Sequence, residues 1–256
     1  MAAARASIRI EKLTKRWPDG SVGIDDIDLE IPGGQFVAIL GRSGAGKSTL
    51  LRCATRLIEP TSGRVFVGDT EVTSATGRAL ARARSRVGFV FQQFNLVRSY
   101  TALENVLVAR LGHVGWWRGL LGVWTPHDRE VAARALTDVG LGAKVDALAR
   151  ELSGGQQQRV AVARAFAQEP GAIFADEPTA SLDPHLAATV LELLRNYGRA
   201  REVPVLVNVH TIEHARKYAD RVIGLNRGRL IHDAPASELS DAAVERIYAP
   251  PQEKAS

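Results

Sequence analysis

A glycine-rich segment near the start of the chain, GRSGAGKS at residues 41–48, has the residue types and spacing of a phosphate-binding loop. Glycines let successive backbone N–H groups turn toward phosphate oxygens, and the N-terminus of a following helix adds positive potential. Lys47 would supply charge to the phosphates, and the hydroxyl of Ser48 is suited to Mg²⁺. The residues predicted to bind phosphate are Gly41, Arg42, Ser43, Gly44, Ala45, Gly46, Lys47, Ser48 and Thr49.

Two adjacent carboxylates, Asp176 and Glu177, follow an apolar run at residues 171–175. Successive side chains on extended backbone point in opposite directions, so these two carboxylates can have different partners. We expect Asp176 to reach the metal ion and Glu177 to act on a water beside the γ-phosphate. Such a pair is often only a turn or a helix cap, but beside a phosphate loop the catalytic role is favoured. The two motifs together predict hydrolysis of a nucleoside triphosphate.

The scaffold for these groups is predicted from apolar runs. The phosphate loop follows a nearly continuous apolar run at residues 35–40 and precedes an apolar helix predicted over 49–57. Strands that are covered on both faces in a parallel sheet have this pattern, and their alternation with helices predicts a doubly wound α/β core. Similar apolar runs recur at residues 87–91, 171–175, 205–209 and 221–225.

The remaining segments predict additions to this core. Alternation of apolar and polar residues predicts antiparallel strands over 7–13, 27–31 and 64–67. Residues from about 94 to 167 are mainly helical in pattern and are predicted to form an inserted helical subdomain. We expect one domain over residues 1–256, with a frayed tail from about 248 to 256.

Composition excludes several classes of protein. With 256 residues, 45% hydrophobic and 24% charged, the chain is typical of a globular protein and not of a disordered or fibrous one. The single cysteine, Cys53, excludes an intramolecular disulfide and is expected to be a small buried residue. The sequence shows neither a run long enough to cross a bilayer nor an apolar leader, which predicts a cytosolic protein.

The formal net charge of +5 is mildly basic. A basic protein can attract nucleic acid or an anionic membrane, so the charge is compatible with either partner. The densest group of cations falls on one predicted helix, and we favour a solvated helix face over a nucleic-acid site. The arginines concerned are Arg78, Arg82, Arg84 and Arg86.

The segment LSGGQQQR at residues 152–159 resembles the signature sequence of ATP-binding-cassette (ABC) ATPases, a motif more specific than a phosphate loop. The order of the motifs is similar to that of the family over residues 8–248. The chain is therefore identified as a member, which implies ATP and Mg²⁺ as cofactors. The resemblance also implies a P-loop NTPase core with a mostly parallel sheet, an N-terminal antiparallel β subdomain and an inserted helical signature subdomain.

The resemblance assigns roles that local chemistry alone does not. Trp17 would stack on adenine, although it could also be an ordinary core or surface aromatic. Gln92 would contact the metal ion and the attacking water, with Gln93 as the alternative register. His210, which follows an apolar strand, would contact the γ-phosphate and position the water and Glu177.

The signature implies a second copy of the chain. In this family the residues at Ser153, Gly154, Gly155 and Gln156 would bind ATP held by another copy, and Asp183 would lie at the interface. Ser153 is also a plausible N-cap for a helix over 156–168, so its alternative role is to cap that helix and bind nothing. The resemblance therefore implies a head-to-tail homodimer with two ATP molecules.

Several segments resemble the ATP-binding subunits of phosphonate importers, and the most discriminating is 111–130. This implies an ATPase at the cytoplasmic face of the cell membrane, with transmembrane permease subunits and a periplasmic phosphonate-binding protein. Its cargo would be phosphonate or a related phosphorus oxyanion. The alternatives are a polar-amino-acid importer ATPase and, remotely, a soluble ABC ATPase acting on nucleic acid or ribosomes, although no nucleic-acid partner is expected. The other similar segments are 60–72, 89–97, 104–112, 117–124 and 218–230.

A tryptophan-rich stretch at residues 111–124 contains Trp116, Trp117 and Trp124. Aromatic residues are enriched at protein interfaces, so the stretch could form a surface that faces the permease. The alternative is that these side chains cover the core of the helical subdomain, which we favour because large aromatic side chains are well buried on average.

Overall fold

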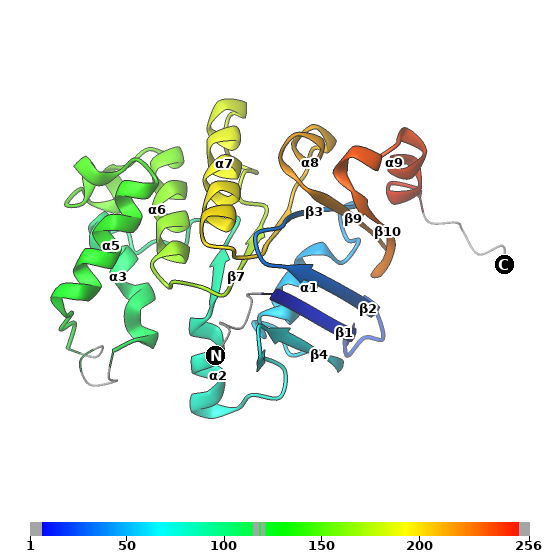
Figure 1. Ribbon diagram of the computed structural model, residues 1–256, viewed down its shortest axis with the longest axis horizontal. Helices are drawn as coiled ribbons and strands as arrows, with labels where there is room; N and C mark the ends of the chain where they lie inside the picture. The colour runs from blue at the N-terminus through cyan, green and yellow to red at the C-terminus, as the bar shows by residue number, and fades with distance from the viewer. Residues whose placement is uncertain (1–6, 115–117, 119–120, 251–256) are drawn as a thin grey trace.

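The computed structural model of this chain describes residues 7–114, 118 and 121–250. These residues form a six-stranded sheet with the strand order β10-β9-β3-β8-β7-β6, which helices cover (Figure 1). Its strands are β3 (Phe36–Leu40), β6 (Val87–Val90), β7 (Ala172–Asp176), β8 (Val205–Asn208), β9 (Arg221–Asn226) and β10 (Arg229–Pro235). The strands from β9 to β6 are parallel, and β10 pairs antiparallel with β9. The predicted parallel α/β core is confirmed.

The second sheet is antiparallel and comes from the N-terminal third of the chain. Among the described residues its order is β2-β1-β4-β5, and Ile8 of β1 pairs with Ile31 on one side and Val67 on the other. Its strands are β1 (Ser7–Arg16), β2 (Val22–Pro32), β4 (Ser62–Val67) and β5 (Thr70–Glu71). The apolar face packs in one cluster with Val37 and Ile39 of β3, as the alternating pattern predicts.

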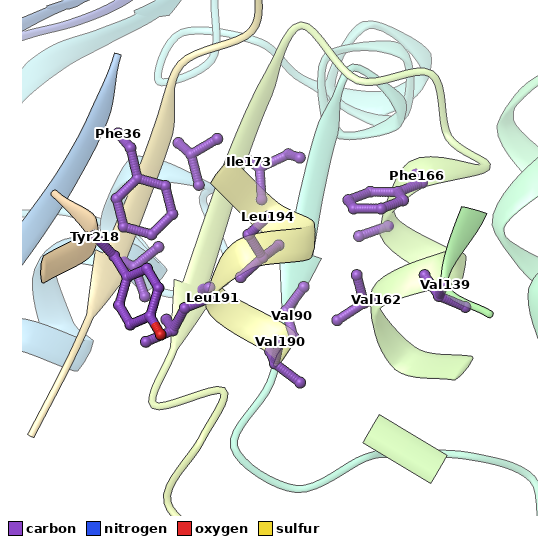
Figure 2. Packing of buried hydrophobic residues seen from close by; sticks show 14 of the residues in the cluster. Phe36, Val90, Val139, Val162, Phe166, Ile173, Val190, Leu191, Leu194 and Tyr218 are labelled. Carbon is purple, nitrogen blue, oxygen red and sulfur yellow. The ribbon is translucent and has the colours of Figure 1, made fainter. Parts of the chain in front are cut away.

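Helices α3, α5 and α6 lie between β6 and β7 in the chain and form one side of the molecule (Figure 1). Their apolar side chains belong to the same cluster as side chains on the adjacent face of the parallel sheet, and this cluster includes Val162, Phe166 and Ile173 (Figure 2). The α-helices are α1 (Lys47–Ala54), α2 (Gly77–Ser85), α3 (Ala102–Leu107), α5 (Pro126–Asp138), α6 (Gly154–Phe166), α7 (Pro184–Ala200), α8 (Ile212–Tyr218) and α9 (Asp241–Ile247). Short 3₁₀ helices are η1 (Val108–Gly112), η2 (Gly142–Lys144), η3 (Ala149–Glu151) and η4 (Ala236–Glu238).

Several smaller expectations can be compared with the structure. Cys53 is buried, and burial raises the pKa of its thiol to about 11. Trp124 is partly buried against the larger apolar cluster, whereas Trp116 and Trp117 lie outside the described residues, as do residues 251–256 of the predicted tail.

None of the helices in the described part of the chain is long and apolar enough to span a bilayer. The arginines predicted on an exposed helix face are exposed on α2 or directly after it.

A buried ion pair in the helical region was not predicted from the sequence. Arg110 of η1 donates to Asp128 Oδ1 at 3.1 Å, and it also reaches the Ala167 carbonyl at 2.9 Å and Glu169 at 2.7 Å. Burial alone would raise the pKa of Asp128, but hydrogen bonds from Thr125 and Arg110 outweigh burial and lower this pKa below its ordinary value. The pair connects η1 with the start of α5 and the end of α6.

Replacing Asp128 with alanine is expected to reduce the free energy of unfolding by about 3 kcal/mol, because the buried Arg110 would lose its buried carboxylate partner and keep only the half-exposed Glu169. The depressed pKa means that the carboxylate stabilises the fold above its unfolded-state pKa of about 4, and that this contribution disappears as pH falls through the lower folded-state pKa. Urea unfolding at neutral and acidic pH measures both effects. The control Glu130→Ala removes an exposed pair with Arg134 and should cost less than about 1 kcal/mol. Equal unfolding free energies for the two variants would contradict the prediction.

Candidate nucleotide-binding site

The phosphate loop lines an open cavity of about 460 Å³ at the carboxyl end of β3. Trp17 and residues 21–23 of the antiparallel sheet region line it on one side, residues 43–49 on another, and Glu177 also contacts it. The structure thus brings together three predicted elements of an ATP site from distant parts of the sequence. A cavity of about 740 Å³ lies over the antiparallel sheet and is lined by residues outside the predicted site.

Glycine is required at two positions where the loop passes close to other backbone. Gly46 has φ +103°, and a Cβ there would lie 2.3 Å from the carbonyl oxygen of Gly23. A Cβ on Gly41 would lie 2.4 Å from the carbonyl oxygen of Leu225. The loop therefore lies directly against the backbone of β2 and of β9, and larger residues at Gly41 or Gly46 would displace it.

Lys47 is the first residue of α1, and its side chain extends back to the first residues of the phosphate loop. Its Nζ donates to the carbonyl oxygens of Gly41 at 2.6 Å and Arg42 at 3.0 Å, and the residue is 6% exposed. Burial lowers the pKa of Lys47 below its ordinary value, although the negative charges of Glu177 and Asp176 oppose this shift. The ammonium group therefore lies within the phosphate loop, where it could contact the phosphate oxygens of a bound nucleotide.

Asp176 ends β7 and is almost fully buried. Its Oδ1 accepts hydrogen bonds from the Ser48 hydroxyl at 2.7 Å and from Asn208 Nδ2 at 3.1 Å. Its Oδ2 accepts from Arg52 at 3.1 Å. Ser48 and Asp176, both predicted to bind Mg²⁺, are thus adjacent. Hydroxyl and carboxylate oxygens are ligands of the kind that Mg²⁺ takes, so the residues fit this ion.

Glu177 has a different partner from Asp176, although it lies just after β7 and its backbone is not extended as the prediction assumed. Its Oε2 lies 2.6 Å from Nε2 of His210, which follows β8. Glu177 has φ +51°, a conformation that is uncommon for non-glycine residues and is often found at functional sites. The neighbouring strands β7 and β8 therefore place a carboxylate and an imidazole in contact beside the phosphate loop.

The signature residues do not line this cavity. Ser153 caps α6: its hydroxyl accepts the Gln156 N–H at 3.3 Å, and the Gln156 side chain accepts the Ser153 N–H at 3.0 Å. Ser153 and Gly154 are exposed, whereas a Cβ on Gly155 would meet Leu186 of α7 at 2.5 Å. The capping role is therefore present, and it leaves the first residues of the signature helix open to solvent.

Gln92 and Asp183 also lie outside the residues that line the cavity. Gln92 is exposed two residues after β6 ends, and Asp183 caps α7 by accepting the N–H groups of His185 and Leu186, each at 3.0 Å. Near Trp17, the Nζ of Lys15 lies 5.0 Å from the ring centroid. One copy of the chain thus assembles part of the predicted site.

Three polar residues at this site were not predicted from the sequence. Asn208 and Arg52 bind Asp176, and buried Gln158 donates to the carbonyl oxygen of Pro178 at 2.7 Å. A polar residue inside an apolar run, as Asn208 is within residues 205–209, could have indicated a position near the site. Gln158 connects the signature helix with the segment that follows the acidic pair.

Comparison with known proteins agrees with this geometry. The model of the family described as ABC transporter matches residues 24–180. The phosphonates import ATP-binding protein PhnC of Nitratidesulfovibrio vulgaris is 46% identical over 242 residues, covering 94% of this chain and 91% of that protein. The protein of the same name from Shouchella clausii is 45% identical over 244 residues, covering 95% and 92%.

A solved structure shows the same fold. It is the dimer of an ATP-binding cassette in a post-hydrolysis state bound to ADP and Pi, and it aligns with a TM-score of 0.78 at 33% identity, covering 90% of this chain and 98% of that chain. These matches confirm the predicted fold class and the resemblance that the signature motif indicated. The chain belongs to the ABC transporter family, as one of its ATP-hydrolysing cassettes.

Proposed function

We propose that this chain is the ATP-hydrolysing subunit of an importer for phosphonates or a related phosphorus oxyanion. Support comes from relatives with this function in their names, which are 46% and 45% identical over more than nine tenths of the chain. The subunit would work as a homodimer at the cytoplasmic face of the cell membrane, attached to transmembrane permease subunits. A periplasmic phosphonate-binding protein would deliver the cargo.

The observation that carries the proposed dimer is the division of the predicted site. The cavity is lined by Trp17, the phosphate loop and Glu177, whereas the signature residues 153–156 are not among the residues that line it. Such an arrangement supports a head-to-tail dimer in which the signature of each copy binds ATP in the cavity of the other. Asp183, exposed at the start of α7, would lie at the same interface.

Several residues of this chain would have separate roles in hydrolysis at the γ-phosphate. Glu177 would accept a proton from the attacking water, and His210, 2.6 Å away, would orient the carboxylate. Lys47 would stabilise charge on the transferred phosphoryl group. Ser48, Asp176 and Gln92 would hold Mg²⁺, which supplies charge neutralisation to the phosphate oxygens when it is bound. Trp17 would stack on adenine.

Deleting the gene for this chain in its own cell is expected to abolish growth on a phosphonate, such as 2-aminoethylphosphonate, as sole source of phosphorus. Growth on inorganic phosphate should be unchanged, because only uptake of the phosphonate depends on this ATPase. Re-expression of the natural chain should restore growth, whereas Lys47→Ala should not. Undiminished growth on phosphonates, with a loss of growth on a polar amino acid as nitrogen source, would favour the amino-acid importer instead.

A further inference from the structure

Gln92 lies in a segment that is fixed to the parallel sheet on one side and to the helical region on the other. The sheet ends two residues before it, at Val90 of β6. Further along the chain, the buried Asn105 of α3 accepts the N–H of Val97 at 2.8 Å and donates to the carbonyl oxygen of Val97 at 3.1 Å. Gln92 itself is exposed and forms no hydrogen bond or ion pair with any of the described residues. The place that its side chain can reach therefore depends on how the backbone of residues 91–96 is held.

Arg164 of α6 holds this backbone shortly after Gln92. Its Nη1 donates to the carbonyl oxygen of Asn95 at 2.7 Å, and its Nη2 donates to the carbonyl oxygen of Phe94 at 3.1 Å. Asn95 has φ +49°, a left-handed conformation that asparagine adopts more readily than most residues. The N–H groups of a guanidinium are fixed in one plane, so one arginine can bind two successive carbonyl groups in a defined orientation. The two carbonyl groups belong to the second and third residues after Gln92.

Arg164 could serve packing alone, since its side chain lines a cavity of about 300 Å³ together with Val87 and Phe91. Packing does not require a charge, however, and burial of a charge without a carboxylate partner is costly. Arg164 forms no ion pair with the described residues, and burial lowers the pKa of its guanidinium. The group keeps its charge because the pKa of arginine lies far above physiological pH. A methionine could line the same cavity, so the two carbonyl contacts are what the guanidinium adds.

We propose that Arg164 is a positioning residue for Gln92: by binding the carbonyl oxygens of Phe94 and Asn95, it fixes the path of the chain beyond β6 and so the reach of Gln92 toward the metal ion. This inference rests on the proposed role of Gln92 in holding Mg²⁺. Arg164 belongs to the helix that begins with the signature, and a Cβ on Gly154 at the start of that helix would lie 3.9 Å from Phe94 Cζ. The segment after Gln92 therefore contacts α6 near both of its ends.

The variant Arg164→Met keeps an unbranched apolar side chain and removes the guanidinium. We expect the Mg²⁺ concentration for half-maximal hydrolysis to rise about three- to tenfold, the effect of about one hydrogen bond, and kcat to fall by a similar factor. The Kd for mant-ATP without Mg²⁺ should be unchanged. In the chain without nucleotide or metal, hydrogen exchange of a peptide covering residues 91–101 should become faster. Arg164→Lys, which keeps the charge on a single nitrogen, should fold normally and show the same effects in weaker form. A purely structural role would lower Tm without changing the Mg²⁺ dependence.

A double variant shows whether Arg164 acts through Gln92. In a Gln92→Ala chain, Arg164→Met should cause no further change in the Mg²⁺ dependence, because the residue that it positions is absent. The matched control is Arg56→Met, since the partly buried Arg56 also donates to a backbone carbonyl, that of Thr73 at 2.8 Å, in a segment without site residues. Its Mg²⁺ dependence should be natural. Additive effects of Gln92→Ala and Arg164→Met would overturn the inference, as would equal effects of Arg164→Met and Arg56→Met. A natural Mg²⁺ dependence in Gln92→Ala alone would instead refute the proposed role of Gln92, and the inference with it.

Discussion

Replacing Glu177 with glutamine is expected to remove most ATP hydrolysis while leaving ATP binding intact. The amide has nearly the same shape as the carboxylate but cannot accept the proton of the attacking water, so turnover should fall roughly 10²- to 10⁴-fold. The contact of 2.6 Å with His210 places the carboxylate beside the phosphate loop, and Glu177 contacts the same cavity as Lys47. Phosphate release and mant-ATP binding measure the two effects separately.

This variant also tests the divided site. Because ATP is no longer consumed, Glu177→Gln should accumulate as an ATP-bound dimer during gel filtration with ATP and Mg²⁺. Adding Ser153→Ala or Gly155→Ala to it should return the chain to the monomer. The control Glu30→Gln changes an exposed carboxylate on β2 and should behave like the natural chain. Hydrolysis at the natural rate by Glu177→Gln would refute its role as base.

Replacing Lys47 with alanine is expected to abolish ATP turnover, a loss of at least about 100-fold. The ammonium group is buried in the loop and donates to Gly41 and Arg42, so its removal takes away both a charge for the phosphates and two bonds that shape the loop. Mant-ATP affinity should fall in the same variant. Phosphate release by the purified chain is the measurement.

The control for this change is Lys144→Ala, which removes an exposed lysine of η2 far from the phosphate loop in the sequence. It should hydrolyse ATP at the natural rate. Undiminished turnover by Lys47→Ala would exclude the phosphate-loop assignment. A fall in turnover that is equal in both variants would show that loss of positive charge in general, and not the position of Lys47, is responsible.

The parallel core and the main site residues could be predicted because their signals are local. A strand covered on both faces needs a continuous apolar run, and β3 is buried throughout its length. The phosphate-loop pattern depends on spacing within eight residues, and Ser48 and Asp176 do lie together. Local patterns are less accurate at element ends: α1 begins at Lys47, after the left-handed Gly46, and ends at Ala54, because Arg56 has φ +52°.

Contacts between distant segments could not be predicted in this way. Asn208 binds Asp176 because β8 lies next to β7 in the sheet. The order of strands in a sheet cannot be inferred from any single apolar run of the sequence. The same holds for Arg110, whose buried partner Asp128 belongs to another helix. Arg42 of the phosphate loop reaches the carbonyl oxygen of Tyr248 only because α9 returns to the end of β9. In each case the sequence shows the residue but not its neighbour.

The position of β3 in the sheet has a consequence for biosynthesis. Phe36 pairs with Val205 of β8, and Val37 pairs with Arg221 of β9, so the strand that carries the phosphate loop has both neighbours late in the chain. Pairings of this kind form slowly, because a long loop must close first. During synthesis on the ribosome, β3 therefore cannot pair with its neighbours in the sheet until most of the polypeptide has emerged. A nascent chain that stops before β8 presents an unpaired apolar strand to chaperones and proteases, and the strand that carries the phosphate loop cannot be fixed in the sheet before β8 and β9 have emerged.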